Sequence, residues 1–140
     1  MLYPFYKSIL QRENASLIHA HFGYEACRLL ASKKASGLPL LTTFYGADAT
    51  EYPRYPQWRE RYRHLFAAGE LFLAEGGAMA QKLVDLGCPQ DKVRVWRLGV
   101  DIERIECIER SPGERVCFLI CAGFKEKKGI PYALKALAVA

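Results

Sequence analysis

The sequence has no long uninterrupted hydrophobic run. Its longest run, Val116 to Ala122, is far shorter than the roughly 18–20 apolar residues that cross a bilayer. No transmembrane helix is therefore expected. The first residues, Met1 to Lys7, also lack the basic leader, long apolar stretch and small-residue cleavage site of a secretory signal. Secretion is not expected for the chain as given.

Paired cysteines are absent as well. The 5 cysteines form an odd set without a CxxC pair, which favours a reducing compartment over a disulfide framework. We expect buried or idle thiols and a cytoplasmic protein. The cysteines are Cys27, Cys88, Cys107, Cys117 and Cys121.

The composition that is present is that of a folded protein. Of the 140 residues, 51% are hydrophobic, which is enough to bury a core and excludes disorder. This length allows one complete domain or pieces of two. The net charge of +5 suits phosphate-bearing ligands, nucleic acid or an anionic membrane surface, and charge alone does not choose among them.

Helix-like and strand-like segments alternate along the chain, which predicts an α/β fold with a parallel sheet covered by helices. We expect strands at residues 16–22, 39–44, 71–74, 93–98 and 116–122. We expect helices at residues 24–36, 57–68 and 78–86 and from residue 130 onward, and a loop at residues 47–56.

The charged segment 102–115 predicts an interdomain linker, because it combines Arg and Glu residues with Ser-Pro-Gly. The helix that follows is apolar, and one strand cannot cover it. We therefore expect most of one α/β domain over residues 1–101, a linker over 102–114 and the first β-α unit of a second domain over 115–140.

Candidate sites lie in the loops that follow strands, because open parallel sheets bind ligands outside the carboxyl ends of their strands. Three such loops carry suitable residues, at positions 21–23, 45–48 and 123–129. The third offers small residues, lysines and a helix N-terminus to phosphate, although a solvated basic turn explains its composition equally well. It matches neither GxxxxGK[ST] nor GxGxxG.

Other reactive side chains have structural explanations that compete with metal binding or catalysis. His19 and His21 share one face of a strand, but zinc needs three or four protein ligands, so no metal is expected. Cys27 falls on an apolar helix face, where a thiol is packing. Asp48 could bind sugar hydroxyls, act as a base or cap the turn after Gly46.

A basic and aromatic segment runs from Tyr52 to His64. This composition is compatible with two functions, stacking on nucleic-acid bases and docking on a membrane surface. A solvated helix face is the leading interpretation.

Five motifs, in this order and spacing, resemble the family 4 (group 1) glycosyltransferases. They are residues 19–23 (HAHFG), 42–48 (TTFYGAD), 86–93 (LGCPQDKV), 99–101 (GVD) and 126–130 (EKKGI). The resemblance implies the GT-B fold, in which two Rossmann-like domains face a cleft. Residues 1–101 would then belong to the acceptor-side domain and residues 115–140 to the nucleotide-sugar donor domain.

The resemblance also assigns site residues. Asp48 and Tyr45 would be catalytic, with Tyr45 standing where the family's HGxD motif often has His. Lys128 matches the lysine that neutralises the donor diphosphate, whose charge grows in the transition state. The family commonly has an arginine shortly before that lysine, and in this sequence Lys125 is the residue nearest to that position. The expected substrate-binding set is His21, Gly23, Gly46, Gly123, Lys125, Lys128 and Gly129.

The implied function is a retaining, metal-independent transfer of a sugar from a nucleotide-sugar to a glycan or lipid-linked acceptor. The nucleotide-sugar is a substrate, and neither a cofactor nor a nucleic-acid partner is expected. Peripheral contact with the inner membrane face is the implied setting. Because the family's paired donor-site glutamates are absent from these residues, this chain alone is expected not to transfer sugar. The alternative is a non-catalytic module that binds a glycan or a membrane surface.

Overall fold

The computed structural model describes residues 3–109, 113 and 116–139. Within it the chain divides into two compact units, Met1–Val100 and Asp101–Ala140. Residues 110–112, 114–115 and 140, which belong to the predicted linker and last helix, lie outside the described residues.

The first unit is built on a four-stranded parallel sheet, in the order β1-β2-β3-β4. This confirms the predicted α/β fold, although β4 ends at Val95 rather than Leu98. In register, Ile18 pairs with Leu40, and Phe72 pairs with Val93. The strands are β1 (Ile18–His21), β2 (Leu40–Phe44), β3 (Leu71–Ala74) and β4 (Val93–Val95).

Helices connect these strands and confirm the three predicted for this unit. The predicted loop at residues 47–56 is wrong in part, because it holds two short helices, with Pro53 buried in the second. A further helix precedes β1 and was not predicted. The helices are α1 (Tyr3–Arg12), α2 (Gly23–Ser36), α3 (Ala47–Thr50), η1 (Tyr52–Arg54), α4 (Pro56–Ala68), α5 (Gly77–Asp85) and η2 (Gln90–Lys92).

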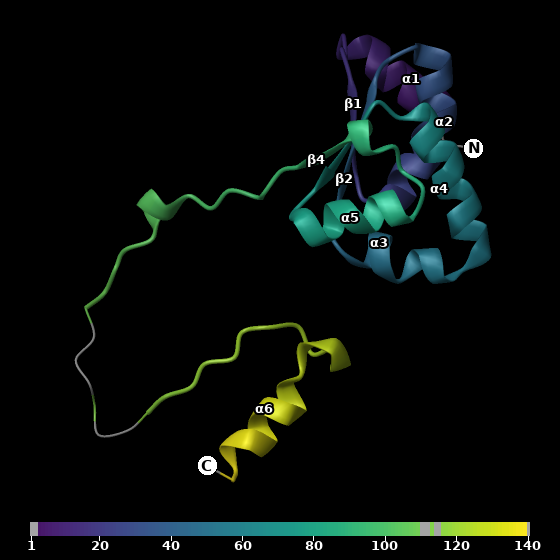
Figure 1. Cartoon of the computed structure of the whole chain (residues 1–140). Helices are drawn as coiled ribbons and strands as arrows, with labels where there is room; N and C mark the ends of the chain where they lie inside the picture. Colours follow the sequence, from purple (N-terminus) through teal and green to yellow (C-terminus); the bar gives the residue numbers. More distant parts are fainter. Residues whose placement is uncertain (1–2, 110–112, 114–115, 140) are drawn as a thin grey trace. The chain divides into compact units, whose positions relative to one another are not determined.

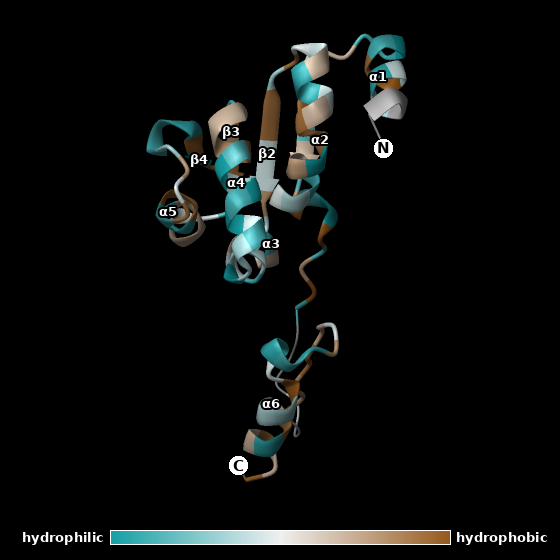
Figure 2. Cartoon of the chain, turned by 90° about the vertical axis from the view of Figure 1, so that its right-hand side faces the viewer, coloured by the Kyte–Doolittle hydropathy of each residue, from teal (hydrophilic) through white to brown (hydrophobic). Residues whose placement is uncertain are grey.

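The three crossovers step in one direction along the sheet. Right-handed parallel crossovers that step the same way place their helices on the same face. Figure 1 shows α2 and α4 side by side along the strands. Figure 2 shows hydrophobic ribbon in β2 and β3 and hydrophilic ribbon along α4.

Alternate strand residues enter a core rich in aromatic rings. Phe44 meets Tyr62 edge-on at 5.7 Å between ring centroids, and Phe66 meets Phe72 edge-on at 5.2 Å. Edge-to-face rings add roughly 0.5–1.5 kcal/mol beyond their buried area. The buried strand residues are Ile18, Ala20, Leu40, Thr42, Thr43, Phe44, Phe72, Ala74 and Val93.

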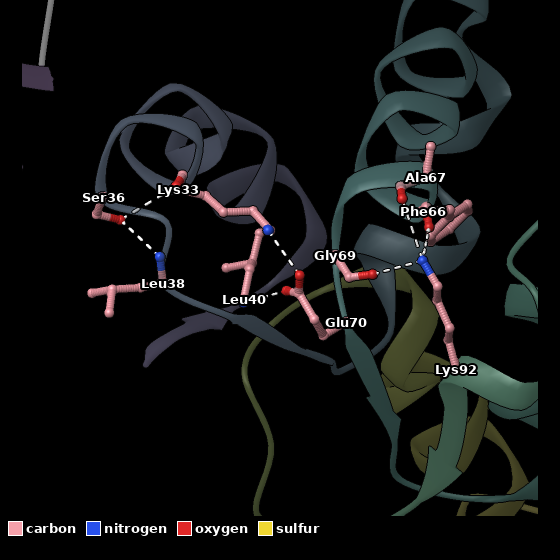
Figure 3. Close-up of polar contacts among 9 residues, drawn as sticks. All are labelled: Lys33, Ser36, Leu38, Leu40, Phe66, Ala67, Gly69, Glu70 and Lys92. Carbon is pink, nitrogen blue, oxygen red and sulfur yellow. Dashed lines mark hydrogen bonds and ion pairs between the residues drawn. The ribbon is translucent and has the colours of Figure 1, made fainter. Parts of the chain in front are cut away.

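Lys92 closes the carboxyl end of α4 (Figure 3). Its Nζ donates to the carbonyl oxygens of Phe66 at 3.1 Å, Ala67 at 3.3 Å and Gly69 at 2.9 Å. The last carbonyls of a helix have no partner within the helix, and a cation also suits their partial negative charge. One side chain from the end of η2, just before β4, therefore holds the turn from α4 into β3.

Glu70 makes a second polar link at the same end of the sheet (Figure 3). Its Oε2 accepts a hydrogen bond from the Leu40 N–H at 2.6 Å, and its Oε1 pairs with Lys33 Nζ at 2.8 Å. Partial desolvation raises the pKa of Glu70, but the Leu40 N–H and the Lys33 ammonium outweigh it and hold this pKa below its ordinary value. Glu70 thereby joins the start of β3 to β2 and α2.

The second unit contains η3 (Ile102–Arg104), η4 (Glu126–Lys128) and α6 (Ile130–Leu137). The predicted strand at residues 116–122 is wrong for this chain, since none of these described residues is in a strand. A strand needs a neighbour for its backbone N–H and C=O groups, and none of the described residues of this unit forms one. Its apolar side chains, including Phe118 and Leu119, are exposed.

The cysteines are free thiols. Cys88 is buried and Cys27 half-buried, whereas Cys107, Cys117 and Cys121 are exposed. Among the described residues, no helix is long and apolar enough to cross a membrane.

Replacing Lys92 by methionine should destabilise the first unit. Lys92→Met leaves three carbonyls of the α4 terminus without their charged donor, at a cost of about 1–3 kcal/mol. Urea unfolding followed by tryptophan fluorescence measures the loss of stability. The control is Lys82→Met, an exposed lysine on α5; equal unfolding midpoints for the two variants would contradict the assigned role of Lys92.

Replacing Glu70 by glutamine should weaken the fold in a pH-dependent way. A carboxyl whose pKa is lowered on folding stabilises the protein above its ordinary pKa of 4.5, and that stabilisation is lost as pH falls through the lower folded value. We expect Glu70→Gln to unfold at lower urea concentration at neutral pH and to approach the parent protein in acid. A gap between the two proteins that does not change with pH would refute the charge contribution.

Candidate functional site

Two of the three predicted loops meet at the carboxyl edge of the sheet. Strands β1 and β2 are paired at His21 and Thr43, so the loops that follow them leave the sheet side by side. The Phe22 N–H extends this pairing by donating to the Thr43 carbonyl at 2.8 Å. The predicted residues of both loops therefore gather in one place.

Asp48 ties these two loops together. Its side chain is fully buried, and Oδ2 accepts a hydrogen bond from the Gly23 N–H at 3.0 Å. Oδ1 accepts from the N–H groups of Tyr45 at 3.1 Å and Gly46 at 2.9 Å. A buried carboxylate is stable only when such donors replace water. These contacts agree with the interpretation of Asp48 as the residue that caps the turn.

Two glycines make this arrangement possible. Gly46 has φ 149° and ψ −86°, a conformation open to glycine and costly for residues with a Cβ. At Gly23 a Cβ would lie 2.6 Å from Phe44 Cζ and 2.9 Å from Tyr62 Oη. Tyr62 cannot easily move away, because its O–H donates to the Asp48 carbonyl at 2.7 Å. Glycine allows the unusual backbone conformation at position 46 and the close packing at position 23.

The exposed edge of the site carries a hydrogen-bonded pair, His21 and Tyr45. His21 Nδ1 and Tyr45 Oη are hydrogen-bonded, and the two rings are nearly parallel at 10°. The centroids of the Phe22 and Tyr45 rings lie 4.9 Å apart. The imidazole and the phenol together present polar atoms beside apolar ring surface, a combination suited to sugars, which have hydroxyl groups and apolar C–H faces.

Phe22 is a site residue that the sequence analysis did not select. Its backbone has φ 75° and ψ 135°, a region that residues with a Cβ rarely adopt, and its side chain is 38% exposed. Strained backbone of this kind clusters at functional sites. The sequence shows only an aromatic residue before a glycine, so no local pattern could have found the strain.

His19 lies beside His21, with the two ring centroids 4.4 Å apart. Its Nε2 is 2.8 Å from Thr43 Oγ1. Partial burial, together with the neighbouring His21, lowers the pKa of His19, which favours a neutral imidazole. Within the described ranges, no three His, Cys, Asp or Glu side chains gather as metal ligands.

The third predicted loop lies in the second unit. The Lys125 N–H donates to the Gly123 carbonyl at 2.8 Å, and Gly129, with φ 68°, begins α6. Lys125 and Lys128 are exposed. The predicted residues thus form two groups: one holds His21, Gly23, Tyr45, Gly46 and Asp48, and the other holds Gly123, Lys125, Lys128 and Gly129.

Comparison with known proteins places this fold in a family. The sequence model of Glycosyltransferase Family 4 matches residues 2–104, which is most of the chain. The chain belongs to glycosyltransferase family 4, which confirms the resemblance inferred from its motifs.

The named relatives are glycosyltransferases assigned to amylovoran and colanic acid biosynthesis. The chain is 31% identical over 129 residues to the amylovoran biosynthesis glycosyltransferase AmsK of Erwinia amylovora, covering 89% of this chain and 31% of that protein. It is 30% identical over 125 residues to the putative colanic acid biosynthesis glycosyltransferase WcaL of Salmonella typhimurium, covering 87% of this chain and 31% of the relative. The WcaL of Escherichia coli is similar at 30% over 126 residues, again covering 87% of this chain and 31% of the relative. The chain therefore spans less than a third of the length of these relatives.

Replacing Asp48 by asparagine should destabilise the first unit. In Asp48→Asn, an amide NH2 can face the Gly23 N–H, so one buried donor loses its acceptor at a cost of about 1–3 kcal/mol. Urea unfolding measures this cost, with exposed Asp91→Asn as the control. A parent-like midpoint for Asp48→Asn would mean that the carboxylate does not hold the two loops.

Proposed function

We propose that this chain forms the acceptor side, and the start of the donor side, of a retaining glycosyltransferase. The enzyme transfers a sugar from a nucleotide-sugar to a glycan or lipid-linked acceptor in polysaccharide synthesis. The observation that carries this proposal is the pair of loops joined by Asp48, which expose the His21–Tyr45 pair at the carboxyl edge of the sheet. The named relatives, with their roles in amylovoran and colanic acid biosynthesis, support the polysaccharide setting.

In this proposal each part of the chain has a role. Residues 1–101 belong to the acceptor-side domain, residues 102–114 to the linker and residues 115–140 to the first β-α unit of the donor domain. The enzyme works in the cytoplasm, with peripheral contact at the inner membrane face. The nucleotide-sugar is its donor substrate, and no metal takes part.

Each of the site residues has a separate role in this proposal. His21 and Tyr45 contact a sugar hydroxyl, because their polar atoms lie at the exposed edge of the loops. Gly46 lets the backbone approach the substrate, Gly23 contributes to the site by allowing its loop to pack closely on the core, and Asp48 positions Tyr45 by holding both loops. Lys128, supported by Gly123, Lys125 and Gly129, neutralises the donor diphosphate as it leaves.

A second candidate is a non-catalytic module that binds a glycan or a membrane surface. It rests on the aromatic and basic side chains from η1 through α4. Tyr52 and Trp58 lie edge-on at 4.9 Å, and Tyr52 stacks on Tyr24 at 4.9 Å. This function would need neither the donor-side loop nor turnover.

Sugar transfer can be tested with the longest polypeptide that the gene encodes around these residues. Incubated with membrane extract and a panel of radiolabelled nucleotide-hexoses, it should move label into the lipid or polymer fraction. Lys128→Ala should lower kcat/KM about 100-fold or more, because a charge that stabilises the leaving group is lost. Tyr45→Phe, which removes one hydroxyl, should lower it about tenfold.

Lys82→Ala is the matched control for Lys128→Ala, since Lys82 is an exposed lysine of α5 and is not one of the proposed site residues. Unchanged turnover in Lys128→Ala would remove the proposed role of that lysine. If the protein consumes no nucleotide-sugar in the panel, the enzymatic proposal is overturned and the binding module is favoured.

A further inference from the structure

Hydrogen bonds on both sides of Phe22 hold its backbone in a strained conformation. Its φ of 75° and ψ of 135° are angles that a residue with a Cβ rarely adopts. The Phe22 N–H donates to the Thr43 carbonyl at 2.8 Å. The next N–H, that of Gly23, donates to Asp48 Oδ2 at 3.0 Å. The Phe22 carbonyl accepts the Ala26 N–H at 3.1 Å, so the peptide groups before and after Phe22 are both fixed.

Glycine would adopt these backbone angles without strain, yet this position carries an aromatic ring. Among the described residues, the other non-glycine residue with positive φ is Asn14, and asparagine adopts such angles more readily than phenylalanine does. Burial explains little of the exception, because Phe22 is 38% exposed. A strained residue whose ring is held partly outside the core points to contact with a ligand.

A column of aromatic rings supports the Phe22 ring. Tyr24 of α2 stacks on Phe22, with ring centroids 5.5 Å apart and an angle of 15° between the ring planes. Tyr52 of η1 stacks on Tyr24 at 4.9 Å, and Trp58 of α4 meets Tyr52 edge-on at 4.9 Å. Because three different elements contribute rings to this column, the Phe22 ring is held in one orientation.

Tyr45, from the loop after β2, lies beside Phe22 without covering it. The planes of the two rings are tilted by 56°, so neither ring covers the whole face of the other. Tyr45 Oη is hydrogen-bonded to His21 Nδ1. An exposed apolar ring therefore lies beside a phenol hydroxyl and an imidazole.

We infer that Phe22 is the stacking platform for the acceptor, and that it selects a pyranose sugar with an uninterrupted face of C–H groups. Such a face packs on an aromatic ring because its weakly positive C–H groups meet the negative π face. The hydroxyl groups at the edge of the sugar can then bond to the His21–Tyr45 pair. A lipid chain would contact the ring but would leave these polar groups unused. The inference rests on the proposed sugar transfer and deepens it by naming the class of acceptor sugar.

Saturation-transfer difference NMR on the full chain tests the inference with three methyl glycosides and no sugar donor. Methyl β-glucopyranoside has no axial oxygen on either face of its ring, and methyl β-galactopyranoside has one face without an axial oxygen. Methyl α-mannopyranoside has an axial oxygen on each face. We expect the first two to bind, with the strongest transfer to the axial ring protons of one face. The mannoside should bind about fivefold more weakly, because it has no uninterrupted C–H face.

Substitutions of Phe22 separate the role of the ring from that of the backbone. Phe22→Gly removes the ring and relieves the strain, so it should unfold at a higher urea concentration than Phe22→Ala and still bind the glucoside about fivefold more weakly than the parent. Phe22→Leu keeps apolar bulk without a flat ring face and should lose affinity in the same direction. The matched control is Phe118→Leu, the same change at a phenylalanine that is 67% exposed and is not one of the proposed site residues. Its affinity should equal that of the parent.

The inference fails if the three glycosides bind the parent equally, because the ring then does not select a C–H face. It also fails if no glycoside binds the parent, or if Phe22→Gly and Phe22→Leu both bind like the parent. A lower unfolding midpoint for Phe22→Gly than for Phe22→Ala would remove the strain from which the inference is drawn, and would overturn it too. The proposed sugar transfer is judged separately, because it fails only if no nucleotide-sugar is consumed, and the glycoside measurements use no donor.

Discussion

The site depends on one buried carboxylate. The Asp48 carboxylate accepts hydrogen bonds from N–H groups of the loop after β2 and of the first residue of α2. These bonds fix both loops beside the carboxyl ends of β1 and β2. The penalty for burying its charge is offset only while all these donors point inward. Tyr62 secures the same loop from α4 through the Asp48 carbonyl, and glycine at position 23 leaves out a side chain that would clash with Phe44 and Tyr62. The position of the His21–Tyr45 pair follows from this geometry.

The opposite end of the sheet is stabilised by different charges. Lys92 caps the end of α4, and Glu70 links β2, β3 and Lys33 (Figure 3). These groups lie at the opposite end of the strands from the candidate site, so charged side chains stabilise the first unit at both ends of its sheet.

Much of the fold could be predicted, because its information is local. Apolar runs of strand length, helical spacing of apolar residues and a stop at Gly37 specify β1, α2 and β2 within a short window of sequence. The prediction at residues 116–122 was wrong for the physical reason that a strand is not a local structure. Its apolar composition is that of a buried strand, but its backbone has no paired neighbour among the described residues. The helices α3 and η1 were missed because Pro53 and Pro56, which lie in and just after η1, are typical of a loop.

The sequence alone determined the α/β class, the order of the four strands of the first unit and the family, because periodic patterns and ordered motifs can be read without contacts. It also indicated His21, Tyr45, Gly46 and Asp48 as members of one site. Only the tertiary structure decided what these residues do to one another. Asp48 meets Gly23 across 25 positions, and His21 meets Tyr45 across 24. The strain at Phe22 is likewise a product of packing, since the backbone angles there are set by neighbours distant in sequence.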